Sequence, residues 1–167
     1  RTFTRLLELG VVPVVNENDT VATDEIRFGD NDRLAALVAH LVGADALVLL
    51  SDVDSLYTEH PSHVGARPIA VVPDIEELEV DTNGTGAEIG TGGMATKLQA
   101  ARIATASGIP VVLAAASSVE AALTGAPVGT LFQATGKRRS RKLMWLAYAS
   151  VSQGELVLDA NSALVWR

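Results

Sequence analysis

The chain has 167 residues, 48% of them hydrophobic, which is enough for one domain with a sizeable core and too apolar for an intrinsically disordered protein. A formal net charge of −7 argues against a nucleic-acid-binding surface over the whole chain, and the absence of cysteine excludes disulfide bonds and thiolate metal sites. The longest hydrophobic region, residues 34–50, is interrupted by His40, Gly43 and Asp45, so we predict no membrane span and expect a cytoplasmic protein.

The first part of the chain predicts a strand, a helix and a second strand. The β-branched run at residues 11–15 predicts the first strand, although the proline inside it favours an edge position or an irregular start. Residues 32–42 predict a helix because apolar side chains recur on one face, and its capping residue is Asp30 or Asn31. The unbroken apolar run at residues 46–50 is typical of a buried parallel strand.

Strand and helix signals keep alternating up to residue 132. We expect an exposed loop at residues 57–67, a short strand at 69–72, a helical turn at 74–78 and a Gly-rich loop at 82–93. A helix at residues 94–107, ended by Gly108, a strand at 109–114, a helix at 119–124 and a last strand at 128–132 follow. This alternation predicts an α/β fold with a mainly parallel sheet covered by helices on both faces.

The last part of the chain breaks this pattern. Residues 137–142, KRRSRK, form a basic cluster that contacts phosphate or RNA or is a solvated connector, and we favour the connector. Alternating residues at 155–158 and 163–166 then predict a β-hairpin. A hairpin alone is marginal in water, so we expect it to dock on the main domain or on a neighbouring chain. We interpret residues 1–150 as the main domain and residues 151–167 as the start of a β module.

Three polar clusters lie beside the predicted strands. Residues 16–19 (NEND) follow the first strand, residues 30–32 (DND) open the next helix, and Ser51 and Asp52 follow the second strand. Ligands of open α/β sheets bind at the carboxyl ends of the strands, which is where these clusters gather. Each cluster alone is as readily a turn or a helix cap, but their shared location favours a binding site.

The Gly-rich stretch at residues 90–97, GTGGMATK, indicates a phosphate-binding site. It is not a P-loop, because it lacks the Gly-Lys-Ser/Thr ending. It matches the dinucleotide pattern G-x-G-x-x-A, but no strand precedes it and no acidic residue follows the next strand. Small residues at a helix N-terminus let backbone N–H groups reach an anion, and Lys97 in the first turn makes sense beside a phosphate. The alternative is a flexible loop with a chance lysine.

Four segments, in this order and spacing, resemble the glutamate 5-kinases of the amino-acid kinase family. They are VPVVNEND, FGDND, LLSDVD and GTGGMATK, beginning at residues 12, 28, 49 and 90, and the resemblance covers essentially the whole chain. It implies a three-layer α/β sandwich with a mainly parallel sheet, incomplete at the N-terminus. It also implies that the C-terminal β segment is the beginning of a PUA-like module.

The resemblance implies an activity as well: phosphorylation of the γ-carboxylate of L-glutamate by ATP with Mg²⁺, the first step of proline biosynthesis. The glutamate-binding residues it implies are Asp19, Asn31, Asn16 and Asp30. The ATP-binding residues it implies are Ser51, Asp52, Thr91, Gly92, Gly93, Met94, Ala95, Thr96 and Lys97. Asp32 would orient the catalytic lysines, one of which is Lys97. The three histidines show no metal-binding spacing, so we predict no metal ligand from the protein.

Two departures from the family pattern limit this interpretation. Ser55 stands where the family usually has glycine. The family's first strand, with another phosphate-binding lysine, is absent, so we expect these 167 residues alone to have little activity. A non-catalytic nucleotide-binding remnant, or a kinase acting on aspartate, acetylglutamate or UMP, stays open as an alternative. Exposed sheet edges favour a homo-oligomer, and we expect no membrane or nucleic-acid partner.

Overall fold

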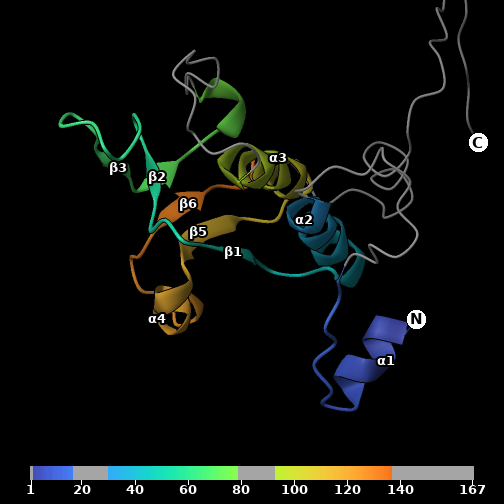
Figure 1. The fold of residues 1–167 in the computed structure, drawn as a ribbon. Coiled ribbons are helices and arrows are strands. Elements are labelled where there is room, and N and C mark those ends of the chain that lie inside the picture. Colours follow the sequence, from blue (N-terminus) through green and yellow to red (C-terminus); the bar gives the residue numbers. More distant parts are fainter. Residues whose placement is uncertain (1, 17–29, 79–92, 137–167) are drawn as a thin grey trace, which may run out of the picture.

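The computed structural model describes residues 2–16, 30–78 and 93–136, drawn in colour in Figure 1. In chain order its elements are α1 (Thr2–Glu8), α2 (Asp30–Val42), β1 (Leu47–Ser51), β2 (Leu56–Tyr57), β3 (Pro68–Ile69), β4 (Val71–Val72), the 3₁₀ turn η2 (Ile75–Glu77), α3 (Gly93–Ala106), β5 (Val111–Ala115), the 3₁₀ turn η3 (Ala116–Ser118), α4 (Val119–Leu123) and β6 (Thr130–Phe132). The alternation of strands and helices confirms the predicted α/β class.

The main sheet has the strand order β1-β5-β6-β4. β1 runs parallel to β5, with Leu47 opposite Val111 and Ser51 opposite Ala115, and β4 runs parallel to β6. β6, however, is antiparallel to β5. The prediction of a mainly parallel sheet is therefore confirmed, with one reversed pairing that the alternation of elements did not indicate.

Helices cover both faces of this sheet (Figure 1). α2 and α3 pack against each other on one face and contact β1 and β5, whereas α4 contacts the same two strands from the other side. The buried positions of α3 include Ala100, Ala101 and Ala104, all 0% exposed. Such small side chains let a helix approach its neighbours closely, so an alanine-rich core suits the observed layers.

Two predicted strands differ from the observed structure. Residues 11–15 form no strand, and Val12 and Val14 are 82% and 94% exposed. No strand of the described ranges pairs with this segment, and β propensity without a pairing partner does not make a strand. The predicted strand at residues 69–72 is divided, because β3 pairs antiparallel with β2 while β4 joins the main sheet.

The helix ends follow local rules of capping. α3 ends before Gly108, whose φ of +78° is the left-handed conformation that glycine adopts without strain. The Gly108 N–H donates to the Thr105 carbonyl and the Ile109 N–H donates to the Ala104 carbonyl, which is a Schellman ending and confirms the predicted stop. α2 begins at Asp30, so Asp30 and Asn31 lie in its first turn and do not precede it as expected.

Several predictions concern residues outside the described ranges. These are the Gly-rich loop up to residue 92, the basic cluster at residues 137–142, and the domain boundary and β module around residues 151–167. Among the described helices, none combines the length and the apolar character required to cross a membrane.

The buried hydroxyl of Thr130 joins the small β2–β3 sheet to the main sheet. The Leu56 N–H donates to Thr130 Oγ1 at 2.8 Å, and this hydroxyl donates to the Ile69 carbonyl at 2.6 Å. Thr130 itself is 0% exposed. One side chain on β6 therefore supplies a hydrogen-bond partner to two backbone groups, one N–H and one carbonyl.

We expect Thr130→Val to lower the free energy of unfolding by on the order of 2 kcal/mol or more, because two backbone groups lose a buried partner. Urea denaturation measures this change. Thr130→Ser is the matched control, since it keeps the hydroxyl and removes only a methyl group. Equal unfolding midpoints for the valine and serine variants would contradict the bridging role of this hydroxyl.

Candidate functional site

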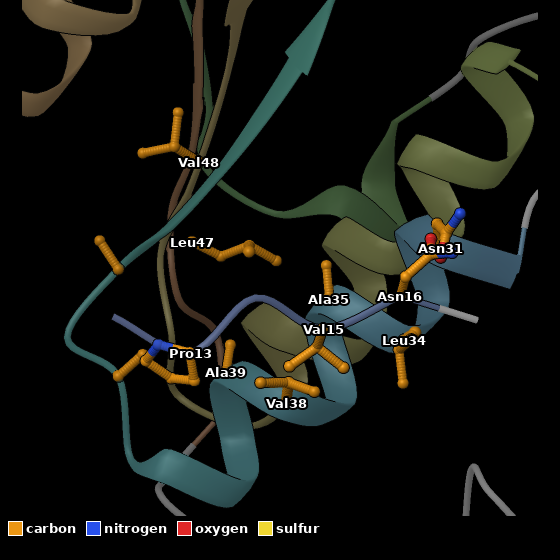
Figure 2. Close-up of a pocket in the computed structure, with 12 residues that line it drawn as sticks. Pro13, Val15, Asn16, Asn31, Leu34, Ala35, Val38, Ala39, Leu47 and Val48 are labelled. Carbon is orange, nitrogen blue, oxygen red and sulfur yellow. The ribbon is translucent and has the colours of Figure 1, made fainter. Parts of the chain in front are cut away.

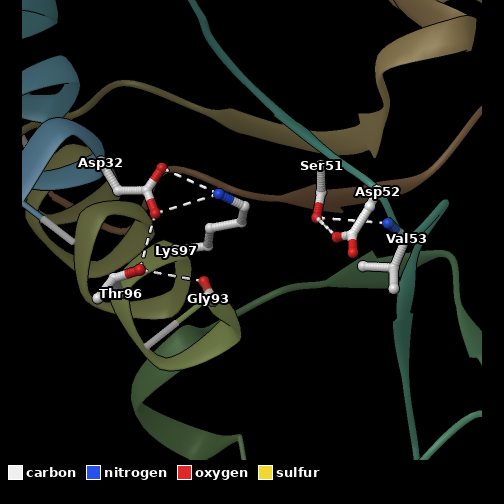
Figure 3. Close-up of polar contacts among 7 residues, drawn as sticks. All are labelled: Asp32, Ser51, Asp52, Val53, Gly93, Thr96 and Lys97. Carbon is white, nitrogen blue, oxygen red and sulfur yellow. Dashed lines mark hydrogen bonds and ion pairs between the residues drawn. The ribbon is translucent and has the colours of Figure 1, made fainter. Parts of the chain in front are cut away.

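An ion pair between α2 and α3 stands at the centre of the candidate site (Figure 3). Lys97 Nζ lies 3.1 Å from both Asp32 Oδ1 and Asp32 Oδ2. The Lys97 and Asp32 side chains are only 16% and 20% exposed. Charged groups withdrawn from water to this degree need a partner, and each supplies the charge that the other requires.

The two helices place these charges near their N-termini. Asp32 is in the first turn of α2, where a carboxylate is favourable because the helix dipole is positive there. α3 begins at Gly93, so Lys97 is just past the first turn and not inside it as the sequence predicted. A cation near this end is still disfavoured by the dipole, and the Asp32 carboxylate compensates for it.

Ser51 and Asp52 form a second polar group, at the carboxyl end of β1 (Figure 3). The Ser51 hydroxyl donates to Asp52 Oδ1 at 3.0 Å and accepts from the Val53 N–H at 3.4 Å. The Ser51 hydrogen bond holds the pKa of Asp52 below its ordinary value, and backbone N–H groups and the positive charge of Lys97 lower this pKa further. The lysine of α3 thus acts electrostatically on the end of β1.

We expect Ser51→Ala to raise the pKa of Asp52 toward its ordinary value of 3.8, because the carboxylate loses its main hydrogen-bond donor. A lowered pKa stabilises the folded state above the ordinary value, and this stabilisation is lost as the pH falls through the folded-state pKa. Titration of the Asp52 carboxyl carbon by NMR measures the change. Ser51→Thr keeps a hydroxyl as control, and an unchanged titration in Ser51→Ala would contradict the assignment.

A pocket of about 400 Å³ lies between residues 13–16, α2 and the start of β1 (Figure 2). Among the described residues that line it, Asn16 and Asn31 are the ones with polar side chains, and Figure 2 shows them at one end of the pocket. The remaining lining residues are apolar: Pro13, Val15, Leu34, Ala35, Val38, Ala39, Ala44, Ala46, Leu47 and Val48. The amide end of the pocket can bind a carboxylate or a carbonyl, whereas the apolar part cannot.

The first turn of α2 connects this pocket to the ion pair. Asn31 lines the pocket, and its neighbour Asp32 contacts Lys97 on α3. Residues predicted for two different tasks, substrate binding and phosphate handling, are therefore consecutive on one helix.

The structure brings together some of the predicted site residues and not others. Gly93, Met94 and Ala95 open α3, and Met94 packs against the core. Asp30 is the first residue of α2. Asp19, Thr91 and Gly92 lie outside the described residues.

One contact was not predicted. The Thr96 hydroxyl donates to Asp32 Oδ2 at 2.7 Å, across 64 positions of sequence. The sequence indicated Thr96 only as a nucleotide contact. No local pattern signals a hydrogen bond between residues so far apart.

Comparison with protein families decides the classification. A model of the Amino acid kinase family matches residues 1–115. The chain belongs to the amino acid kinase family. Solved structures of other proteins share the fold of this chain. These include a protein from Aeropyrum pernix K1, at 25% identity and a TM-score of 0.52 over 74% of this chain and 38% of that one. A carbamate kinase from Giardia has 22% identity and a TM-score of 0.56 over 79% of this chain and 46% of its own.

Curated relatives of this amino acid kinase are far more similar to it in sequence than these two solved structures are. The glutamate 5-kinase of Cutibacterium acnes is 63% identical over 158 residues, which are 95% of this chain and 40% of that protein. The glutamate 5-kinase of Streptomyces coelicolor is 60% identical over 161 residues, which are 95% of this chain and 43% of that protein. That of Bifidobacterium adolescentis is 54% identical over 165 residues, 98% of this chain and 44% of that protein. The chain thus spans less than half the length of the relatives it matches.

Proposed function

We propose that this chain serves the ATP-dependent phosphorylation of the side-chain carboxylate of L-glutamate, the first step of proline biosynthesis. The observation that carries the proposal is the Asp32–Lys97 pair, which places a cation near the N-terminus of α3. The identities of 52% to 63% with glutamate 5-kinases support the choice of substrate.

The reaction needs alignment and charge stabilisation rather than a base. A glutamate side chain has a pKa of about 4.3, so its carboxylate is ionised at neutral pH and is the nucleophile as it stands. One carboxylate oxygen forms a bond to the γ-phosphorus of ATP, and the bond from that phosphorus to the β–γ bridging oxygen breaks, which releases ADP. The protein must supply positive charge beside the equatorial oxygens of the transferred phosphoryl group, and it must align the glutamate carboxylate in line with the bond that breaks.

The predicted site residues divide into groups that match these needs. Asn16 and Asn31, at the polar end of the pocket, donate amide hydrogen bonds to glutamate, with Asp19 and Asp30 as further contacts. Lys97 and the backbone N–H groups of Gly93, Met94 and Ala95 face the phosphates at the start of α3. Asp32 fixes the direction of Lys97, and Ser51 and Asp52 contact the nucleotide together with Thr91 and Gly92.

Mg²⁺ is the expected cofactor of this proposal, and we expect it to arrive with the nucleotide. Mg²⁺ in kinases keeps several waters and is bound through substrate phosphates and one or two carboxylates. Within the described ranges, no three His, Cys, Asp or Glu side chains are grouped so as to hold a metal ion. The ion would add positive charge to the β- and γ-phosphates, and we assign it no protein ligand.

Two further aspects follow from the proposal. A cytoplasmic location fits a biosynthetic enzyme that consumes ATP. A homo-oligomer fits the position of β1 as an edge strand among the strands that the structure describes, since strand edges favour association.

Glutamate-dependent release of ADP tests the proposal directly. In an intact enzyme we expect ADP release with L-glutamate and ATP, and none when glutamate is omitted. A panel containing aspartate, acetylglutamate and UMP identifies a different amino acid kinase. ATP binding without transfer to any acceptor would favour the non-catalytic alternative.

A further inference from the structure

Within the described part of the chain, the Thr96 hydroxyl has two acceptors within reach, and it has one hydrogen to donate. Asp32 Oδ2 lies at 2.7 Å and the Gly93 carbonyl at 3.0 Å (Figure 3). A threonine within a helix ordinarily donates to a carbonyl three or four residues earlier. Here the charged acceptor is also the nearer one, and hydrogen bonds to ionised groups are roughly twice as strong as neutral ones. The hydroxyl therefore donates to Asp32.

Asp32 is consequently held from α3 by two consecutive residues. Lys97 Nζ contacts both carboxylate oxygens, and Thr96 contacts Oδ2. The two side chains differ in conformational freedom, because threonine is branched at Cβ and has few rotamers, whereas lysine has a flexible four-carbon chain. The Thr96 hydroxyl is therefore the more rigid of the two contacts to the carboxylate.

We propose that Thr96 is a positioning residue that acts through Asp32 and not a nucleotide contact. Its hydroxyl fixes the Asp32 carboxylate, and the fixed carboxylate directs Lys97 to the transferred phosphoryl group. This inference rests on the proposed kinase function and assigns to Thr96 a task different from the one that its place in the Gly-rich segment suggested.

The first test compares Thr96→Val with Thr96→Ser in the intact enzyme. Losing a hydrogen bond to a charged group corresponds to a decrease in kcat of about tenfold or more, and we expect the KM for ATP to stay within about twofold. Thr96→Ser keeps the hydroxyl and restores kcat to within about threefold of the original value. A valine variant that raises the KM for ATP and leaves kcat unchanged would show a nucleotide contact and overturn the proposal.

A double-mutant cycle identifies the group through which Thr96 acts. In an Asp32→Asn background, the further change Thr96→Val is expected to lower kcat by less than about twofold, because the two residues act as one unit. Full additivity of the two effects would overturn the proposal. If Thr96→Val does not fold, as judged by circular dichroism, Thr96→Ala takes its place in both experiments.

A labelling experiment separates this proposal from the kinase function itself. Lys97 is one of three lysines in the chain, and Lys137 and Lys142 serve as internal references. We expect Thr96→Val to increase the acylation rate of Lys97 several-fold relative to these references, because the Asp32 carboxylate loses a hydrogen bond and pairs less firmly with Lys97. Thr96→Ser should leave the acylation rate unchanged. Equal Lys97 labelling in all three proteins overturns the positioning role whether or not kinase activity is found. Absence of glutamate-dependent ADP release, with the labelling as expected, overturns only the proposed function.

Discussion

Lys97→Ala is expected to reduce the turnover of an intact enzyme by about two to three orders of magnitude. Lys97 lies near the N-terminus of α3, where we expect it to stabilise negative charge on the transferred phosphoryl group. Removal of one such preorganised stabiliser raises the activation barrier by on the order of 3 kcal/mol. Because Lys97 stabilises charge that develops during transfer, kcat should fall far more than the affinity for glutamate. Steady-state kinetics with both substrates varied measures the two effects.

Arg102→Ala is the matched control for this substitution. Arg102 lies on the same helix and is also a cation, but its side chain is 52% exposed, and its Nε lies 3.8 Å from Glu76 Oε1. Exposed ion pairs of this kind contribute little to stability, so kcat should stay within about twofold of the original value. Near-normal turnover in Lys97→Ala, or equal losses in both variants, would show that Lys97 has no part in phosphoryl transfer.

Gly129→Ala is expected to destabilise the fold by about 3 kcal/mol or more. Gly129 precedes β6 with a φ of +73°, and an added Cβ would lie 2.0 Å from the carbonyl oxygen of Leu113 on β5. That oxygen belongs to the backbone of a buried strand, so relief of the overlap must separate β5 from β6. Urea denaturation, followed by circular dichroism, measures the lost stability.

Gly125→Ala separates the two causes of this effect. Gly125 also has a positive φ, +79°, but an added Cβ would meet no atom within 4 Å. We expect a loss of about 1–2 kcal/mol there, which is the cost of the left-handed conformation alone. If the two alanine variants lost equal stability, the close approach of Gly129 to β5 would be of no energetic consequence.

The elements that could be predicted best are those whose signals are local. The alanine-rich run and the glycine at position 108 predicted α3 almost to the residue, because periodicity and a left-handed C-terminal glycine act within a few residues. The apolar run at residues 46–50 predicted β1 equally well, and the polar residues after it marked the end of the strand. Position at the end of β1 likewise indicated Ser51 and Asp52 as site residues.

Strand pairing is where prediction failed. Residues 11–15 have the composition of a strand and form none in the described structure, and residues 69–72 divide between two sheets. The reversal of β6 against β5 has no local signal either. Which strand pairs with which is settled by long-range packing, and β propensity carries little information about it.

The amino-acid sequence by itself determined the α/β class and most of the helices and strands, and it indicated candidate site residues. A resemblance to a family assigned expected roles to those residues, and these roles remain predictions. Only the tertiary structure decided that Asn31 faces a pocket while the adjacent Asp32 contacts α3, and that Thr96 bonds to Asp32. The physical reason is distance along the chain: Asp32 and Lys97 are 65 positions apart, and only the packing of α2 against α3 brings their charges to 3.1 Å.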